Sequence, residues 1–254
     1  MSVIPTTDQA WRFHIDQSTW NGHKSLERCV SCLRPDSQPV ADIIDTRRDI
    51  LISKGLYPGP YSTGPDGQGL IPSCDRAGEV VTVGEDVTQW KKGGRVHSLF
   101  YETWFDGPVQ DEHIPLTVGS GTSGCLAQYR VFDAKTLIPI PPHLSYEEAS
   151  TIACAAVTTW HSFFEKRPIT KGSTVLVLGS GGVSIFGAQL AKAAGARVIA
   201  TTSSKEKEAK YKALGVNEVI NYCDVPEWSK RVMELTGGNG VEQVLEVGES
   251  HTVV

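Results

Sequence analysis

Apolar and polar residues follow one pattern before residue 140 and a different one after it. In the first part, short runs rich in Val, Tyr and Phe lie between glycine- and proline-containing turns, as in "AGEVVTVGEDV", "GGRVHSLF" and "CLAQYRVFD". Such runs between turn-forming residues are typical of β-strands. They predict a β-rich N-terminal domain over residues 1–140.

After residue 140, short apolar runs alternate with segments of helical periodicity. The predicted strands are "TVLVLG", "RVIATT", "NEVINY" and "VEQVLEV". One predicted helix begins at Tyr146, and three more cover Val183–Ala194, Lys205–Leu214 and Pro226–Leu235. Gly195 and Gly215 are expected to end two of these helices. The alternation predicts an α/β domain with a doubly wound parallel sheet over residues 141–254, beyond the proline-rich boundary "LIPIPPHLSYEEAS".

The glycines after the first of these strands, in "VLVLGSGGVS", predict a dinucleotide-binding turn. Gly179 allows a tight turn, Gly181 leaves room for a phosphate beside backbone N–H groups, and the helix opening near Val183 directs its positive end at that phosphate. Ser184 occupies the third glycine position of the G-x-G-x-x-G pattern, so a glycine turn in an unrelated α/β fold is the alternative. The predicted pyrophosphate contacts are Gly179, Ser180, Gly181, Gly182 and Val183.

The end of the second strand distinguishes between the two nicotinamide dinucleotides. NAD sites place an Asp or Glu there to bind the ribose 2′-hydroxyl, whereas this chain reads Thr201-Thr202-Ser203-Ser204-Lys205. Hydroxyl groups and an ammonium group suit a 2′-phosphate. We therefore predict NADP(H), bound by Ser203, Ser204 and Lys205. The alternative for Lys205 is an ordinary residue in the first turn of a solvated helix.

Together with the glycine turn, the motifs "AGEVVTVGEDVTQWKKGGRV", "HLSYEEASTIACAAVTTWHSF" and "ALGVNEVINY" resemble the medium-chain dehydrogenase/reductase superfamily over residues 49–248. The likeness is greatest to its zinc-independent, quinone-oxidoreductase-like and enoyl-reductase-like members. It implies a GroES-like substrate domain followed by a Rossmann domain. It also implies hydride transfer from NADPH to a quinone, an enone or another small carbonyl compound.

The resemblance further implies roles for three residues. Thr158 falls where the family contacts the nicotinamide, and Tyr222 falls where NADP-dependent members pack beside the adenosine phosphate. Asp75 falls at a position that, in the family, faces the cleft between the two domains, and it is the candidate catalytic residue. The alternatives are a strand-end aromatic for Tyr222 and a turn or N-cap aspartate for Asp75.

Zinc-dependent relatives carry Gly-His-Glu where this chain has Ser73-Cys74-Asp75. In the resemblance, Cys74 and Cys154 align with two catalytic-zinc ligand positions. A catalytic zinc needs three protein ligands, and the segment before Asp49 has no cysteine at the family's remaining place. We therefore predict no metal, with Cys74 and Cys154 acting as small buried hydrophobic residues.

Three features depart from the family pattern. Arg76 stands where the family has a small glycine, so a bulky cation is expected to intrude on the cleft. The segment Glu27–Arg48 lacks the expected alternating strands, and residues 21–48 are therefore predicted to be atypical. The chain also stops after the fourth strand of a sheet with the order 3-2-1-4-5-6, so the Rossmann sheet is expected to be incomplete, with an exposed edge.

Composition narrows the remaining classes of function. The 254 residues are 40% hydrophobic, with a net charge of −5 spread over interspersed acids and bases. This favours a globular protein with a small-molecule substrate over one that binds nucleic acid or a membrane. Six cysteines without a small disulfide framework and a polar N-terminus predict a cytoplasmic protein, and the edge strand is compatible with a homo-oligomer.

Three functions remain after these exclusions. The first is an NADPH-dependent oxidoreductase that works without zinc. The second is a truncated, catalytically silent relative that binds a dinucleotide. The third is a zinc-dependent alcohol dehydrogenase, which the missing ligands disfavour.

Overall fold

The computed structural model describes residues 7–13, 26–32, 38–44, 47–57, 64, 67 and 69–248. The chain forms two compact units, Met1–Cys154 and Ala155–Val254. The predicted boundary after residue 140 stays a prediction. The helix that follows it, α2 (Tyr146–Ser150), packs Ala149 against Ala77 and Ile140 of the first unit. Among the described residues, no helix combines the length and apolar character that crossing a membrane requires.

The second unit contains a parallel sheet whose four described strands lie in the order β10-β9-β8-β11. They are β8 (Thr174–Val177), β9 (Arg197–Thr202), β10 (Glu218–Asn221) and β11 (Gln243–Leu245). Numbered along the chain, this order is 3-2-1-4, which matches the first four positions of a dinucleotide-binding sheet. The predicted Rossmann-type sheet is therefore confirmed.

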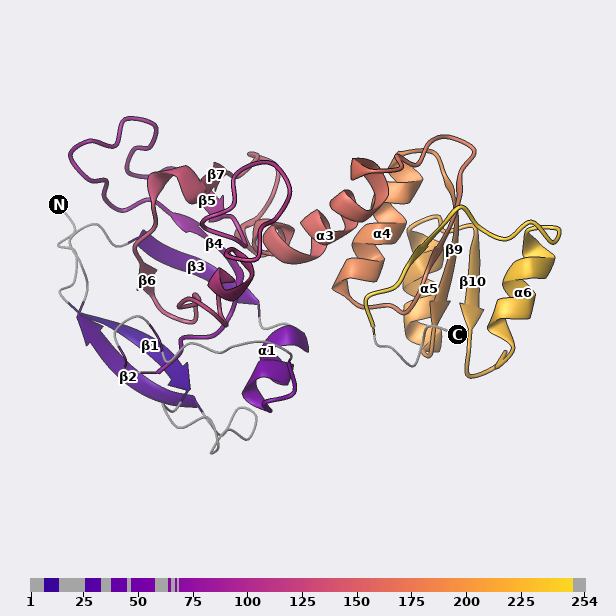
Figure 1. Ribbon diagram of the computed structural model, residues 1–254, viewed down its shortest axis with the longest axis horizontal. Coiled ribbons are helices and arrows are strands. Elements are labelled where there is room, and N and C mark those ends of the chain that lie inside the picture. The colour runs from indigo at the N-terminus through magenta and orange to yellow at the C-terminus, as the bar shows by residue number, and fades with distance from the viewer. Residues whose placement is uncertain are drawn as a thin grey trace. The chain divides into compact units, whose positions relative to one another are not determined.

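Helices cover both faces of this sheet, with α4 and α5 on one face and α6 on the other (Figure 1). The helical segments of the unit are α3 (Val157–Trp160), the π-helical turn His161–Glu165, α4 (Gly182–Ala193), α5 (Lys205–Ala213) and α6 (Trp228–Leu235). Val175 and Val177 belong to the core shared with α4 and α5, whereas Leu176 belongs to the core shared with α6. Successive strand residues face opposite sides of the sheet, and helices cover both sides. The run "TVLVLG" is therefore continuously apolar from Val175 to Leu178.

The predicted ends of α4 and α5 are confirmed. Gly195 follows α4 with a φ of +80°, and Gly215 follows α5 with a φ of +74°. A residue with a side chain rarely adopts this left-handed conformation, so glycine allows the chain to turn back toward the next strand.

Gly187 allows α4 to approach the sheet closely. A β-carbon added at this position would lie 2.5 Å from Leu245 Cδ2 and 3.5 Å from Val177 Cγ2. We expect Gly187→Val to lower the free energy of unfolding by about 1–3 kcal/mol, because overpacking displaces the surrounding side chains. Denaturant unfolding measures this loss. The control is Gly84→Val, whose β-carbon would meet only Val87 Cγ2, at 3.9 Å, and an equal loss in both variants would contradict the expectation.

β11 lies at one end of the described sheet, next to β8, as predicted for the fourth strand. Val244 is 53% exposed, while its neighbour Leu245 is buried in the core shared with α4. Exposed backbone groups on an end strand favour pairing with another chain. Homo-oligomer formation stays a prediction.

The first unit contains an antiparallel sheet whose five described strands lie in the order β6-β3-β4-β5-β7, and a separate antiparallel pair, β1-β2. The strands are β1 (Thr7–Phe13), β2 (Leu26–Cys32), β3 (Gln38–Ile44), β4 (Asp75–Glu79), β5 (Arg95–Ser98), β6 (Tyr129–Arg130) and β7 (Leu137–Pro139). Its helical segments besides α2 are α1 (Arg47–Ser53), the 3₁₀ turns Ile114–Leu116 and Ala134–Thr136, and the π-helical turn Ile152–Ala156, which crosses into the second unit. The predicted β-rich N-terminal domain is confirmed.

The expectation that Glu27–Arg48 lacks strands is wrong. β2 pairs along its whole length with β1, and β3 pairs with both β4 and β6. Charged residues and prolines interrupt the apolar alternation of this segment, which hid the strands from the pattern. A strand is also stabilised by its partners, so a weak local pattern is sufficient where two neighbours supply hydrogen bonds.

Candidate functional site

The glycine turn joins β8 to α4 in the second unit. Gly179 has a φ of +76°, which requires glycine, and Gly181 is the extended N-cap residue of α4. The first helical bond of α4 runs from the Ile185 N–H to the Gly181 carbonyl, at 2.9 Å. The N–H groups that precede Ile185 in the helix, those of Gly182, Val183 and Ser184, therefore have no carbonyl partner within the helix. They lie at the positive end of the helix. This arrangement suits an anion such as a phosphate.

Side chains from neighbouring elements hold this turn in place. The Gly179 N–H donates to Thr201 Oγ1 at 3.0 Å, and the Tyr211 hydroxyl donates to the Gly179 carbonyl at 2.8 Å. Burial raises the pKa of Tyr211, which keeps this hydroxyl protonated and donating. Ser180 Oγ lies 3.1 Å from Thr202 Oγ1. Sequence reasoning missed Tyr211, since nothing in its helix marks it as a partner of the turn.

Ser184 is compatible with the third glycine position of the motif. It is buried, and its Oγ donates to the Leu178 carbonyl at 2.8 Å. Gly187, one helical turn later, is the residue that allows close packing of α4 on the sheet. At Gly181, by contrast, an added β-carbon would meet no heavy atom within 4 Å, so space is open beside the start of the helix.

The end of β9 lies next to the turn and carries no carboxylate. Ser203 is exposed, and Ser204 caps α5 by accepting a hydrogen bond from the Lys207 N–H at 3.4 Å. Lys205 is exposed, and within the described part of the chain its side chain has no hydrogen bond or ion pair. The acids of the first turn are paired instead with later lysines: Glu206 with Lys210 at 2.7 Å and Glu208 with Lys212 at 2.5 Å.

Tyr222 lies beside this strand end. Its N–H donates to the Thr202 carbonyl at 3.0 Å, and its side chain is 41% exposed. The structure therefore brings Tyr222 to the same edge of the sheet as Ser203 and Lys205. Its role in binding stays a prediction.

Thr158 lies on α3 and is exposed, with its carbonyl accepting a hydrogen bond from Ser162 Oγ at 2.8 Å. The buried neighbour Thr159 connects α3 to α4, because its Oγ1 donates to the Val183 carbonyl at 3.0 Å. Thr158 thus belongs to a segment fixed to the start of α4. Its contact with a nicotinamide stays a prediction.

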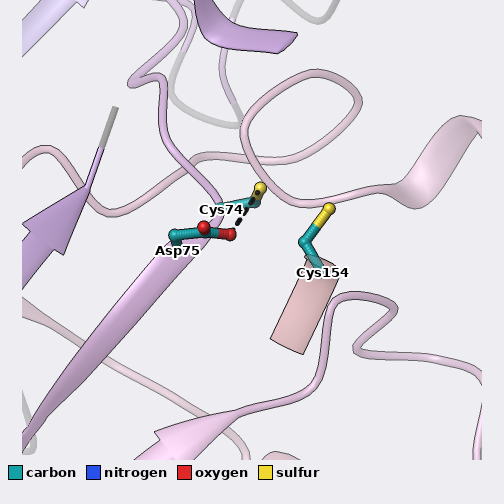
Figure 2. Close-up of side chains that lie close together, drawn as sticks. All are labelled: Cys74, Asp75 and Cys154. Atoms are coloured by element: carbon teal, nitrogen blue, oxygen red, sulfur yellow. Dashed lines mark hydrogen bonds between the residues drawn. The ribbon is translucent and has the colours of Figure 1, made fainter. Parts of the chain in front are cut away.

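A second candidate group of side chains lies in the first unit. Cys74, Asp75 and Cys154 bring two sulfur atoms and a carboxylate oxygen within 4.8 Å of one another (Figure 2). Asp75 is the first residue of β4, Cys74 directly precedes it, and Cys154 lies in the π-helical turn Ile152–Ala156. The Cys74 S–H donates to Asp75 Oδ1 at 3.4 Å. The buried Cys74 and the partly buried Cys154 pack in a core cluster with Val118 and Phe100.

The pKa values of the two thiols in the cluster are shifted in opposite directions. Their shared hydrogen bond raises the pKa of Cys74 and lowers the pKa of Cys154, because it stabilises a thiolate on Cys154. Burial raises the pKa of Asp75 to about 6, despite the hydrogen bond from Cys74. Asp75 can therefore hold a proton at a pH near neutrality.

The shift at Asp75 predicts a dependence of stability on pH. Burial raises its pKa to about 6 in the folded chain from an ordinary value of 3.8, so the folded state retains a proton over a pH range in which the unfolded state has released it. The contribution of Asp75 to the free energy of unfolding is therefore greatest below pH 3.8. It falls by about 1–3 kcal/mol as the pH rises from there to above the folded-state pKa of about 6. Denaturant unfolding across this range should show a smaller decline for Asp75→Asn than for the wild type. Asp106→Asn, which removes an exposed carboxylate, is the control, and parallel curves for the wild type and Asp75→Asn would contradict the assignment.

Two buried arginines flank the cluster. Arg48 donates to the Val118 carbonyl at 3.0 Å and to Ser120 Oγ at 2.6 Å. Arg76 is 2% exposed, and its guanidinium donates inward to the carbonyls of Cys74 and Leu99. Backbone acceptors of the first unit therefore hold the cation, and its intrusion on the cleft stays a prediction.

The cluster fits the donor types that zinc accepts. Zinc in catalytic sites takes three protein ligands, and thiolate sulfur and carboxylate oxygen are both suitable. Sequence reasoning counted only the two thiols, whereas the structure places Asp75 with them as a third donor. The prediction of no metal stays a prediction.

Two family models match the chain. Residues 45–142 match the alcohol dehydrogenase GroES-like domain, and residues 182–253 match the zinc-binding dehydrogenase family. Among solved structures, a candidate alcohol dehydrogenase of Sinorhizobium meliloti 1021 is similar, with a TM-score of 0.84 and 31% identity over 98% of this chain and 72% of that one.

Curated relatives of the chain are also dehydrogenase-like or oxidoreductase proteins. The chain is 40% identical over 208 residues to a zinc-type alcohol dehydrogenase-like protein of Schizosaccharomyces pombe, covering 81% of this chain and 59% of the relative. It is 31% identical over 191 residues to a quinone oxidoreductase of Pseudomonas aeruginosa, covering 75% of this chain and 50% of the relative. The chain thus spans less than two thirds of the length of these relatives.

The matched regions agree with the described fold. The GroES-like match lies in the β-rich unit, and the dehydrogenase match begins at Gly182, the first residue of α4. The chain belongs to the medium-chain dehydrogenase/reductase superfamily.

Proposed function

We propose that this chain is an NADPH-dependent oxidoreductase that transfers hydride to a quinone, an enone or another small carbonyl compound without zinc. The observation that carries the proposal is the open glycine turn at the start of α4, next to a strand end without a carboxylate. The similarity to a quinone oxidoreductase supports the class of acceptor. We also propose that the chain acts in the cytoplasm.

The residues of the second unit would bind the cofactor. The N–H groups at the start of α4, over Gly181–Val183, would hold the pyrophosphate, and Ser180 would line the turn. Ser203, Ser204 and Lys205 would bind the 2′-phosphate, with Tyr222 beside the adenosine and Thr158 at the nicotinamide. When bound, NADPH supplies the hydride, and the protein orients it. Asp75 would hold the proton that the reduced acceptor needs, because its pKa is raised to about 6.

Oxidation of NADPH in the presence of a panel of quinones and enones tests this function. Loss of the reduced-nicotinamide absorbance that depends on both the chain and an acceptor is the expected result. A folded chain that binds NADPH but oxidises none of it with any acceptor would favour the catalytically silent relative instead.

The cluster of Cys74, Asp75 and Cys154 favours a second candidate, a zinc-dependent dehydrogenase. These three residues would hold the ion, which would polarise the substrate carbonyl. Elemental analysis of the purified chain after dialysis separates the two candidates. We expect zinc far below one ion per chain. A full equivalent that is lost in Cys154→Ser would support the zinc enzyme and contradict our prediction.

A further inference from the structure

Two thiols from distant parts of the sequence share one site in the first unit. Cys74 lies directly before β4, and Cys154 lies in the turn after α2. Their sulfur atoms are within 4.8 Å of each other, and Figure 2 shows the two side chains on separate segments of the chain. A disulfide needs its sulfur atoms at about 2.05 Å, so rotation about the side-chain bonds has to bring them together.

The two thiols differ in access to solvent. Cys74 is fully buried, whereas Cys154 is only partly buried. A small oxidant therefore reaches Cys154 first. Cys74 then offers a second thiol within 4.8 Å of the Cys154 sulfur. Asp75 Oδ1 already accepts the S–H proton of Cys74 at 3.4 Å, so an acceptor for that proton is in place.

We propose that Cys74 and Cys154 form a reversible disulfide when the chain meets a hydroperoxide. The Cys154 sulfur attacks the terminal peroxide oxygen, the O–O bond breaks, and Cys154 becomes a sulfenic acid while the remaining oxygen leaves as an alcohol, or as water from hydrogen peroxide. The Cys74 sulfur then attacks the Cys154 sulfur, Asp75 accepts the thiol proton and passes it to the departing hydroxide, and water leaves. Two thiols are oxidised to one disulfide, and one hydroperoxide is reduced.

Two cysteines outside the pair, Cys125 and Cys223, provide internal comparisons. Cys125 is buried, and its sulfur lies 3.8 Å from Arg130 Nη1. Cys223 is exposed on the second unit. If access alone decided oxidation, Cys223 would react before the pair. If the pairing of two thiols decides it, Cys74 and Cys154 react together and Cys125 stays reduced.

Peptide mapping by mass spectrometry tests the proposal without any assay of activity. The reduced full chain, in buffer with a chelator, is treated with hydrogen peroxide, blocked with an alkylating reagent and digested without reductant. We expect a cross-linked peptide that contains Cys74 and Cys154, lighter by two hydrogen atoms than its two free peptides together. Both cysteines should lose alkylation in parallel, and dithiothreitol should restore it.

Single variants sharpen this test. In Cys74→Ser we expect Cys154 to accumulate as a sulfenic acid that a dimedone probe traps, and in Cys154→Ser we expect Cys74 to stay reduced. Cys223→Ser should leave the cross-link unchanged. The proposal is overturned if, in the wild type, Cys154 is oxidised while Cys74 remains open to alkylation, or if either cysteine cross-links to a different cysteine. Because the wild-type map decides this outcome, a variant that fails to fold does not affect the result.

Discussion

Replacing Gly181 with valine is expected to lower the affinity for NADPH by at least about a hundredfold while the chain stays folded. A β-carbon at this position meets no heavy atom within 4 Å, so the fold has room for a side chain. The branched side chain would occupy the space in which a phosphate approaches the N–H groups of α4. Each hydrogen bond lost to a charged group costs about 1.5–3 kcal/mol, so losing two of them gives an effect of this size. Titration calorimetry with NADPH measures it.

Gly84→Val is the matched control, because it also adds a valine at a glycine with room for a β-carbon, but in the first unit. It should leave the affinity unchanged. Circular dichroism and the unfolding midpoint should agree for both variants and the wild type. Unchanged NADPH affinity in a folded Gly181→Val chain would show that the cofactor lies elsewhere.

NADPH is expected to bind more tightly than NADH, and Lys205→Ala should reduce the difference by about tenfold to a hundredfold, or roughly 1–3 kcal/mol. The physical reason is the charge at the end of β9. Lys205 is exposed with no partner in the described part of the chain, while Glu206 and Glu208 are each paired with a lysine one turn later. The ammonium group is thus available to a 2′-phosphate and has no counterpart in NADH.

Lys212→Ala is the control for this prediction, because it removes the same charge from the last turn of α5. Titration of the three proteins with both cofactors should show a changed ratio of affinities only for Lys205→Ala. Equal affinities of the wild-type chain for NADPH and NADH would refute the preference, and a similar effect of both variants would show that only the general field of the helix matters.

The second unit could be predicted from the sequence because its local signals agree with its tertiary structure. The predicted strand "RVIATT" coincides with β9, since its apolar residues are buried and a helix cap follows at once. Gly195 and Gly215 gave the helix ends, because a left-handed residue after a helix is nearly always glycine. The strand order then followed from right-handed crossovers.

The first unit was harder to predict because its strands depend on partners that are distant in sequence. β2 and β3 were missed, although β2 pairs with β1 over its whole length. The run "AGEVVTVGEDV" predicted a strand, but β4 begins before it, at Asp75, and ends at Glu79. Short antiparallel strands are defined by their neighbours, so a pattern in one segment does not give their bounds.

The candidate sites also combine features that the local sequence predicts with contacts between distant segments, which it does not predict. The glycine turn is local, and the structure places its residues where the sequence predicted them. The residues that hold it, Thr201 and Tyr211, come from other elements. In the cluster, Cys74 and Asp75 are neighbours in the sequence, but the local sequence does not predict that Cys154 joins them.

Transfer of deuterium from labelled cofactor is the most direct test of the proposed function. NADPH is prepared with deuterium at one or the other hydrogen position on C4 of the nicotinamide, and each form is incubated with the chain and an enone or quinone acceptor. An enone is the more informative acceptor, because the hydrogen added to its carbon does not exchange with water. We expect the reduced enone to carry deuterium from one of the two labelled forms only, as direct hydride transfer in a fixed orientation requires. A reduced product without deuterium from either form, or no reduced product from a folded chain saturated with NADPH, would contradict the account.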